Sequence, residues 1–369
     1  MNTVSEVTDF DTVLVVLGAT ATGKSALADA LAVRVGAEVV SADSMQIYRG
    51  MNIGTAKLSA AERSVPYHGI DLVDAADVFT AALYQRYARS VVADCLSRGK
   101  RVVFCGGSGL YLRAALDDLQ LDEGLDAEPG DGDRDKDRDK GTVLSSLSQR
   151  QEDSSFLSEQ PGDDFPIPPA DLRATLNAQA EQLGPVAFHQ LLASRDPESA
   201  ALIHPNNTRR VVRAFELLAQ GSSYAQVNAG FARYESVYPA RFVGLTVERE
   251  LLYQLIDQRV DAMIAGGLLD EVRGLLDAGL RRALTAGQAI GYKELVAVLD
   301  DQAQLTDAVA AIKQATRRYA KRQMTWFKRD KRVEWLDVTD LHRQRIQQEL
   351  GDQQFGELLL ERLSELWPL

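Results

Sequence analysis

The chain has 369 residues, a formal net charge of −12, two cysteines and four histidines. Its length allows a full α/β core together with a second lobe. The few cysteines and histidines exclude a disulfide framework and a zinc cluster of the usual spacing. No apolar run approaches the roughly 18 residues that a membrane span needs. We therefore expect a soluble, cytoplasmic protein in a reducing compartment, with no membrane segment.

The negative charge is concentrated in one segment. Residues 117–164 hold 16 acidic and 5 basic residues, so nearly all of the net charge lies there. Net charge therefore does not exclude a nucleic-acid partner for the rest of the chain. The same segment has few apolar residues and mixed charge repeats, which predicts a disordered insertion over 121–164.

The first 119 residues alternate between strand-like and helix-like runs. Apolar, β-branched runs at 12–18, 37–43 and 101–107 end at Gly or Asp, as buried parallel strands do. A helix of about 18 residues is predicted after Thr80, a suitable N-cap, and Gly99 lies past its end. This alternation predicts an α/β fold in which helices cover a parallel sheet.

After the insertion the pattern is helical and then returns to the sheet. A strand is predicted at 240–247, three helical segments follow it, and residues 332–338 offer an edge strand. Helical periodicity with Gly stops indicates a small lobe before that strand. The predicted parts are an α/β core (1–119 and 236–340), the acidic insertion (121–164), a helical lobe (165–235) and an amphipathic helical tail (341–369).

Residues 18–25, GATATGKS, fit the pattern G-x-x-x-x-G-K-S. The motif lies between a predicted strand and a predicted helix, the context that makes it specific for phosphate. Backbone N–H groups and the helix N-terminus attract oxyanions, Lys24 adds a positive charge, and Ser25 can hold Mg²⁺ as a cofactor. The residues predicted to bind the phosphates are Gly18, Thr20, Ala21, Thr22, Gly23, Lys24 and Ser25.

Asp43 follows the second predicted strand. The carboxyl ends of parallel strands meet at one edge of a sheet, so we expect Asp43 beside the phosphate site. Enzymes that transfer or hydrolyse a γ-phosphoryl group generally need a second Mg²⁺-binding carboxylate after a later strand, but the strand at 101–107 ends in glycines. We therefore predict that Asp43 accepts a hydrogen bond or a proton from a second substrate.

Two basic segments are typical of an RNA-binding protein. Arg210 and Arg213 lie one helical turn apart in the predicted lobe, with Arg209 beside them. Residues 313–332 hold nine basic residues, one acidic residue and three aromatic residues. Basic and aromatic side chains together suit RNA. The spacing of 313–332 is equally typical of a helix with an aromatic core face and a solvated basic face, so both interpretations stay open.

Seven segments resemble the tRNA dimethylallyltransferase family, whose members are also called tRNA isopentenyltransferases. The resemblance is colinear and covers nearly all of 12–338 outside the acidic insertion. The segments are GATATGKS, SADSMQIYRGMNIGTAK, PYHGIDL, VVFCGGSGLYL, IHPNNTRRVVRAFEL, AIGYKEL and TRRYAKRQMTWFKR. The resemblance implies a P-loop NTPase-like parallel sheet flanked by helices, with an inserted small helical domain. It also implies transfer of a dimethylallyl group from dimethylallyl diphosphate to N6 of the adenosine 3′ of the anticodon.

The resemblance further implies roles for single residues. Asp43 matches the general base of the family, and Arg259 matches an arginine that grips the diphosphate, which is the leaving group. Lys24 would stabilise the same leaving group. The implied partners are a tRNA anticodon stem-loop and dimethylallyl diphosphate, and we expect a monomer. The implied tRNA contacts are Asp43, Ser44, Met45, Gln46, Ser108, Arg209, Arg210, Arg213, Gln288, Gly291, Tyr292 and Lys293.

The residues alone leave two other classes of function open. A small-molecule or nucleotide kinase would use the same P-loop, although its lid arginines and second metal carboxylate are not visible in the sequence. A non-catalytic RNA-binding module would explain the basic segments but not the complete P-loop. His68 and His204 have no partners at metal spacing, so we expect loop or capping roles for them. Cys105 is expected in the core.

Overall fold

The structure is a computed structural model that describes residues 11–119, 121 and 170–367. It divides into two units, of which the first comprises Met1–Asp122 and Tyr234–Leu369 and the second Glu123–Arg233. The predicted disordered insertion lies outside the described residues, apart from Leu121. Within the described part of the chain, no helix has both the length and the apolar character that a membrane span requires.

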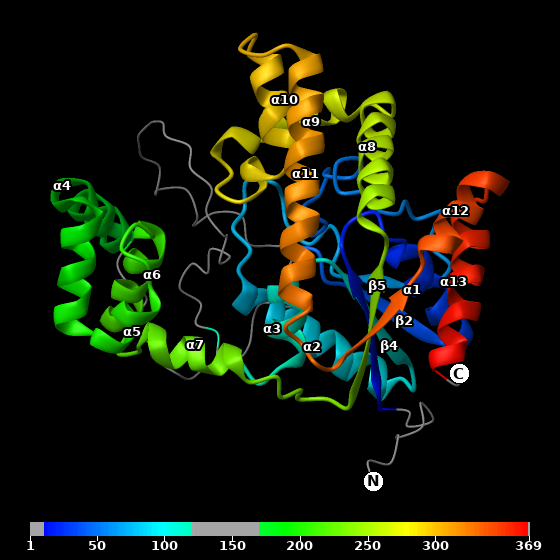
Figure 1. Ribbon diagram of the computed structural model, residues 1–369, viewed down its shortest axis with the longest axis horizontal. Helices are drawn as coiled ribbons and strands as arrows, with labels where there is room; N and C mark the ends of the chain where they lie inside the picture. Colours follow the sequence, from blue (N-terminus) through cyan, green and yellow to red (C-terminus); the bar gives the residue numbers. More distant parts are fainter. Residues whose placement is uncertain (1–10, 120, 122–169, 368–369) are drawn as a thin grey trace. The chain divides into compact units, whose positions relative to one another are not determined.

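A six-stranded, fully parallel sheet forms the centre of the first unit, in the order β3-β2-β4-β1-β5-β6 (Figure 1). Every residue of β1 is buried, because helices cover both faces of the sheet. The predicted parallel sheet and its edge strand are confirmed. The strands are β1 (Val13–Gly18), β2 (Ala37–Ser41), β3 (Tyr67–His68), β4 (Arg101–Gly106), β5 (Ala240–Thr246) and β6 (Val333–Asp337).

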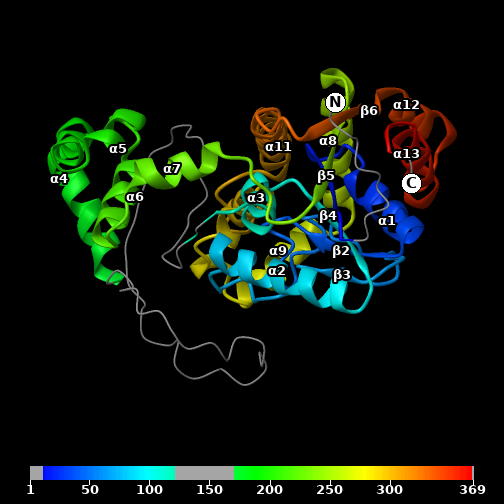
Figure 2. The ribbon, with the colours of Figure 1, turned by 90° about the horizontal axis from the view of Figure 1, so that it is seen from below.

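Helices cover both faces of this sheet, with α1 and α13 on one side and α2 and α3 on the other (Figure 2). Thr80 accepts a hydrogen bond from the backbone N–H of Leu83 at 3.2 Å, so the predicted N-cap of α2 is confirmed. The α-helices are α1 (Lys24–Val35), α2 (Ala81–Ser97), α3 (Gly109–Leu116), α8 (Arg249–Ala265), α9 (Leu268–Asp277), α10 (Tyr292–Leu299), α11 (Leu305–Phe327), α12 (Thr339–Gln348) and α13 (Asp352–Leu366), with short 3₁₀ turns at Leu280–Arg282 and Ala286–Gln288.

Two local features differ from the sequence prediction. Strand β2 ends at Ser41, two residues earlier than predicted, because Asp43 Oδ1 accepts the backbone N–H of Met45 in a turn that takes the chain out of the sheet. Strand β3 was not predicted, since two residues carry no periodic signal. His68 therefore lies in a strand rather than in a loop.

The residues predicted as a separate helical tail belong to the first unit. Phe355, Leu359 and Leu363 of α13 are fully buried and pack in the same core cluster as α1 and β1. A Cβ atom on Gly23 of the P-loop would lie 2.8 Å from the ring of Phe355. The end of the chain therefore supports the P-loop directly, which amphipathic spacing alone did not indicate.

The second unit is helical. Phe188, Val211 and Phe215 are among the residues of its own buried core. The longest helix contains a non-helical residue at Gly184, with φ 75°, followed by Pro185, so the predicted glycine stop is present as a sharp kink. The helices of this unit are α4 (Ala170–Arg195), α5 (Pro197–Leu202), α6 (Thr208–Ala219) and α7 (Tyr224–Ala232).

Candidate active site

Residues 18–25 form a tight loop between β1 and α1. Gly18 has φ +145°, and a Cβ atom there would lie 2.8 Å from the carbonyl oxygen of Leu245 in the neighbouring strand β5. Gly23 has φ +90° and caps the N-terminus of α1 in a left-handed conformation. Both positions require glycine because an added side chain would clash or strain the backbone. The loop therefore ends directly at the N-terminus of α1, and a helix N-terminus attracts anions.

A cavity lies beside this loop, with an empty volume of about 710 Å³ that includes its open mouth. Lys24 and Ser25 line the cavity from α1, Asp43 from the segment after β2, and Arg259 from α8. The structure thus places the P-loop, Asp43 and Arg259 around one space.

The cavity is strongly cationic at its P-loop end. The pKa of Lys24 is lowered to about 8, mainly by burial; the nearby Arg259 also lowers it, whereas Cys105 and Asp43 raise it. Burial also lowers the pKa of Arg259. The Nζ atom of Lys24 donates to the carbonyl oxygen of Ala19 at 2.5 Å. Burial deprives the two cations of part of their interaction with water. An anionic ligand in the cavity would compensate for this loss, so the site favours one.

Asp43 is held in a fixed orientation. Its Oδ1 atom accepts the backbone N–H of Met45 at 2.9 Å. The backbone N–H of the buried Ser44 donates to the hydroxyl of the buried Ser108 at 3.1 Å, which ties this segment to the start of α3. The hydroxyls of Ser44 and Ser108 therefore support the turn that carries Asp43. The implied contacts of these two residues with tRNA stay predictions.

Gln46 lines the same cavity, but its amide group is engaged within the protein. Its Oε1 atom accepts from Ser41 Oγ at 2.8 Å, and its Nε2 atom donates to the carbonyl oxygen of Thr55 at 3.2 Å. Met45 is half-buried beside it. Gln46 therefore has a fixed side chain at the cavity wall.

Tyr292 is fully buried. Its hydroxyl donates to Glu271 Oε1 at 2.7 Å, and the same carboxylate accepts the backbone N–H groups of residues 52, 53 and 54 at 2.9, 2.7 and 3.1 Å. Thr55, the next residue, lines the cavity. The hydroxyl of Tyr292 therefore helps to hold this loop beside the cavity. Its implied tRNA contact stays a prediction.

The other residues with implied tRNA contacts differ in exposure. Gln288 and Lys293 are exposed, whereas Gly291 is buried. In the second unit, Arg209 of α6 is exposed, Arg210 is half-buried, and Arg213 lies 3.5 Å from Glu216. All three arginines lie on α6, in the second unit.

Helix α11 contributes Gln323, which the sequence analysis did not single out, and Tyr319, one of the three aromatic residues of 313–332. Tyr319 and Gln323 both line the cavity. Gln323 Oε1 accepts the backbone N–H of Thr20, and its Nε2 atom donates to the carbonyl oxygen of Gly107, both at 2.9 Å. The i, i+4 spacing of Tyr319 and Gln323 was the available signal. The same helix carries the exposed cations Arg318, Lys321 and Arg322, of which Arg322 lies 5.7 Å from the centroid of the Tyr319 ring.

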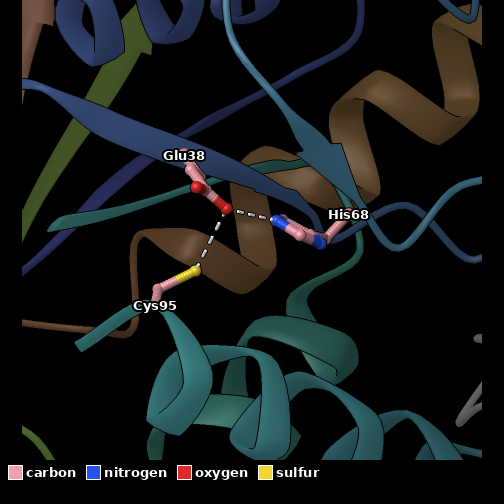
Figure 3. Close-up of side chains that lie close together, drawn as sticks. All are labelled: Glu38, His68 and Cys95. Carbon is pink, nitrogen blue, oxygen red and sulfur yellow. Dashed lines mark hydrogen bonds and ion pairs between the residues drawn. The ribbon is translucent and has the colours of Figure 1, made fainter. Parts of the chain in front are cut away.

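A second group of reactive side chains joins β2, β3 and α2, and consists of Glu38, His68 and Cys95 (Figure 3). His68 Nε2 and Cys95 Sγ lie 2.7 and 3.4 Å from Glu38 Oε2. Arg98 binds both carboxylate oxygens at 2.7 and 2.9 Å and, with its hydrogen bonds, lowers the pKa of Glu38 to about 2. A metal ion would have to compete with this guanidinium, so the group is a structural tie between three elements.

Comparisons with known proteins give one consistent result. A family model described as IPP transferase matches residues 46–330. A tRNA dimethylallyltransferase of Geobacter metallireducens is 43% identical over 326 residues, which are 88% of this chain and 92% of that protein. A tRNA dimethylallyltransferase of Bacillus subtilis is 39% identical over 328 residues, which are 89% of this chain and 91% of that protein.

Solved structures agree with the sequence comparisons. The full-length tRNA isopentenylpyrophosphate transferase of Bacillus halodurans has a TM-score of 0.57 and 33% identity, with 96% of this chain and 97% of that chain covered. A eukaryotic dimethylallyltransferase acting on tRNA has a TM-score of 0.65 and 26% identity, with 91% of this chain and 76% of that chain covered. The similarity therefore extends over most of the chain.

Proposed function

The chain belongs to the IPP transferase family, and from this premise we propose that it transfers a dimethylallyl group from dimethylallyl diphosphate to N6 of the adenosine on the 3′ side of the anticodon in tRNA. The observation that carries this proposal is the single cavity shared by the P-loop and Asp43. Asp43 is the one carboxylate among the described residues that line it. A kinase would need a further acidic residue for its metal, so the site favours transfer of the organic group.

The P-loop end of the cavity binds the diphosphate as a leaving group. As the allylic C–O bond breaks, negative charge gathers on the diphosphate oxygen. Lys24, Arg259 and the backbone N–H groups of the loop are already in place, so they stabilise this charge more in the transition state than in the ground state. The limited solvation of both cations strengthens these interactions.

Asp43 acts on the acceptor. The lone pair of the adenine amino group is delocalised into the ring, so N6 is a poor nucleophile. Asp43 accepts a hydrogen bond from N6–H, orients the amino group, and takes its proton as the C–N bond forms. Oδ1 is bound by Met45, whereas Oδ2 has no hydrogen-bond partner among the described residues, which suits it to this contact.

Mg²⁺ is the cofactor that we propose for the diphosphate. This ion is usually held by few protein oxygens together with substrate phosphates and water. The hydroxyl of Ser25 belongs to the P-loop and lines the cavity, so it fits as the protein ligand. When bound, the ion would supply additional positive charge to the leaving group.

The RNA substrate is an anticodon stem-loop. Its target base has to leave the loop stack to enter the cavity, which costs little in a single-stranded loop. Exposed cations on α6 and on α11 contact the phosphates. The residues concerned are Arg209, Arg318, Lys321 and Arg322. The protein acts as a cytoplasmic monomer.

The test is incubation of the protein with an anticodon stem-loop and either dimethylallyl diphosphate or ATP, followed by mass spectrometry of the RNA. Gain of one dimethylallyl group with release of diphosphate is the expected result. ATP consumption with phosphorylated product would indicate a kinase, and unchanged reactants would indicate a binding module. An Asp43→Asn variant is the matched control, because it keeps the size of the side chain but cannot accept the proton.

A further inference from the structure

The cavity beside the P-loop has apolar as well as polar and charged lining residues. The polar and charged ones include Lys24, Ser25, Asp43, Lys57, Arg63 and Arg259. The apolar ones come from β2, β3 and the segments on either side of β3. These apolar residues, called here the apolar wall, are Val39, Ala56, Leu58, Tyr67 and Ile70.

An allylic diphosphate likewise has a charged part, the diphosphate, and an apolar part, the hydrocarbon chain. Its diphosphate is held at the cationic end of the cavity, so its hydrocarbon chain extends away from the P-loop. Burial of each CH₂ group against apolar side chains contributes about 0.8 kcal/mol. The apolar wall is therefore the surface on which the hydrocarbon chain of the donor lies.

Tyr67 is the largest member of this wall, and its ring is held from three sides. Its hydroxyl donates to Asp29 Oδ1 of α1 at 3.1 Å. The guanidinium of Arg63 lies 5.9 Å from the ring centroid and donates to the carbonyl oxygen of Leu58 at 2.9 and 2.6 Å. The backbone of Tyr67 pairs with Val39 in the sheet. These contacts fix the ring, so it cannot swing aside without breaking several of them.

The residue after Tyr67 anchors the strand itself. His68 lies 2.7 Å from the buried Glu38 of β2, which Cys95 of α2 also contacts (Figure 3). Arg98, the C-cap residue of α2, binds the same carboxylate. The short strand β3 is thereby tied to both β2 and α2. Because packed interiors resist displacement, the apolar wall keeps its position when a ligand enters.

We propose that Tyr67 limits the length of the allylic chain, so that the cavity accepts a five-carbon donor and excludes a ten-carbon donor such as geranyl diphosphate. This inference rests on the proposed function. A chain longer by one isoprene unit has to displace the Tyr67 ring and with it the contacts to Asp29 and Arg63. The five-carbon chain leaves those contacts intact.

The experiment compares geranyl and dimethylallyl diphosphate as donors to an anticodon stem-loop, with kcat/KM measured for each. Tyr67→Val keeps a residue that suits a strand but removes the ring. We expect it to raise the ratio of geranyl to dimethylallyl kcat/KM by about 10- to 200-fold, the usual range for a change of pocket size. Tyr67→Phe is the matched control, since it keeps the ring and loses only the bond to Asp29, and its ratio should rise far less than that of Tyr67→Val.

Leu58→Ala provides a second variant on the same wall, in case Tyr67→Val does not fold, and it should shift the ratio in the same direction. The inference is overturned if the folded variants keep the wild-type ratio, if they change only the KM for RNA, or if the wild-type protein uses both donors equally well. A wild-type protein that transfers neither group to RNA would instead refute the proposed function.

Discussion

Raising the pH from 7 to 9 should weaken the binding of dimethylallyl diphosphate, because Lys24 then loses its proton. Burial lowers the pKa of Lys24 to about 8 in the free protein. A bound diphosphate raises this pKa again, since a negative charge favours the protonated form. The complex therefore holds more protons than the free protein, and the affinity falls as the pH rises through the lower of the two pKa values.

The magnitude follows from the free pKa. With a value of about 8, Lys24 is about 90% protonated at pH 7, about half protonated at pH 8 and about 10% protonated at pH 9. Binding should then take up about 0.1, 0.5 and 0.9 protons, and Kd should rise about tenfold from pH 7 to pH 9. The thiol of Cys105, whose pKa burial raises to about 11, stays protonated throughout this range.

The assay is titration calorimetry without RNA, so that no transfer occurs. Each pH is measured in two buffers of different ionisation enthalpy, and the difference in heat gives the proton uptake. Lys24→Arg keeps a permanent charge and should abolish the uptake, whereas Lys293→Arg, at an exposed position, should leave it unchanged. Proton uptake that stays the same from pH 7 to pH 9 in the wild-type protein would refute the reasoning.

Four further predictions concern other parts of the site. Asp43→Asn should lower kcat by about 10²- to 10⁴-fold without changing RNA affinity in filter binding, and wild-type turnover would exclude it as the base. Glu271→Gln removes the charge that binds three backbone N–H groups and should lower the free energy of unfolding in urea by about 1–3 kcal/mol, whereas the exposed Arg273→Ala should not. Phe355→Ala should lower the free energy of unfolding by about 3–5 kcal/mol. It should also raise the KM for dimethylallyl diphosphate, because Phe355 packs on Gly23 of the P-loop. An unchanged KM would limit α13 to a role in folding. Deletion of 122–164 should preserve activity and tighten RNA binding at low salt by removing acidic residues, and weaker binding would contradict this.

The amino-acid sequence was sufficient for the features that depend on neighbouring residues. The strands β1, β4, β5 and β6, the cap at Thr80 and the stop at Gly184 follow from local patterns of side chains and from the backbone freedom of glycine. The P-loop could also be predicted from local sequence, because its glycines, lysine and serine lie within eight consecutive residues. The position of Asp43 at the same edge of the sheet followed from the geometry of parallel strands.

Contacts between distant residues depended on the folded chain. Gln323 bonds to the backbone of Thr20 across 303 positions, Phe355 packs against Gly23, and the hydroxyl of Tyr292 binds Glu271. Neither residue of such a pair shows in its local pattern which partner it will meet, because the pairing depends on how whole helices pack against the sheet. The apolar wall around Tyr67 has the same origin, since its members lie on different segments that only the packed sheet and its loops bring together.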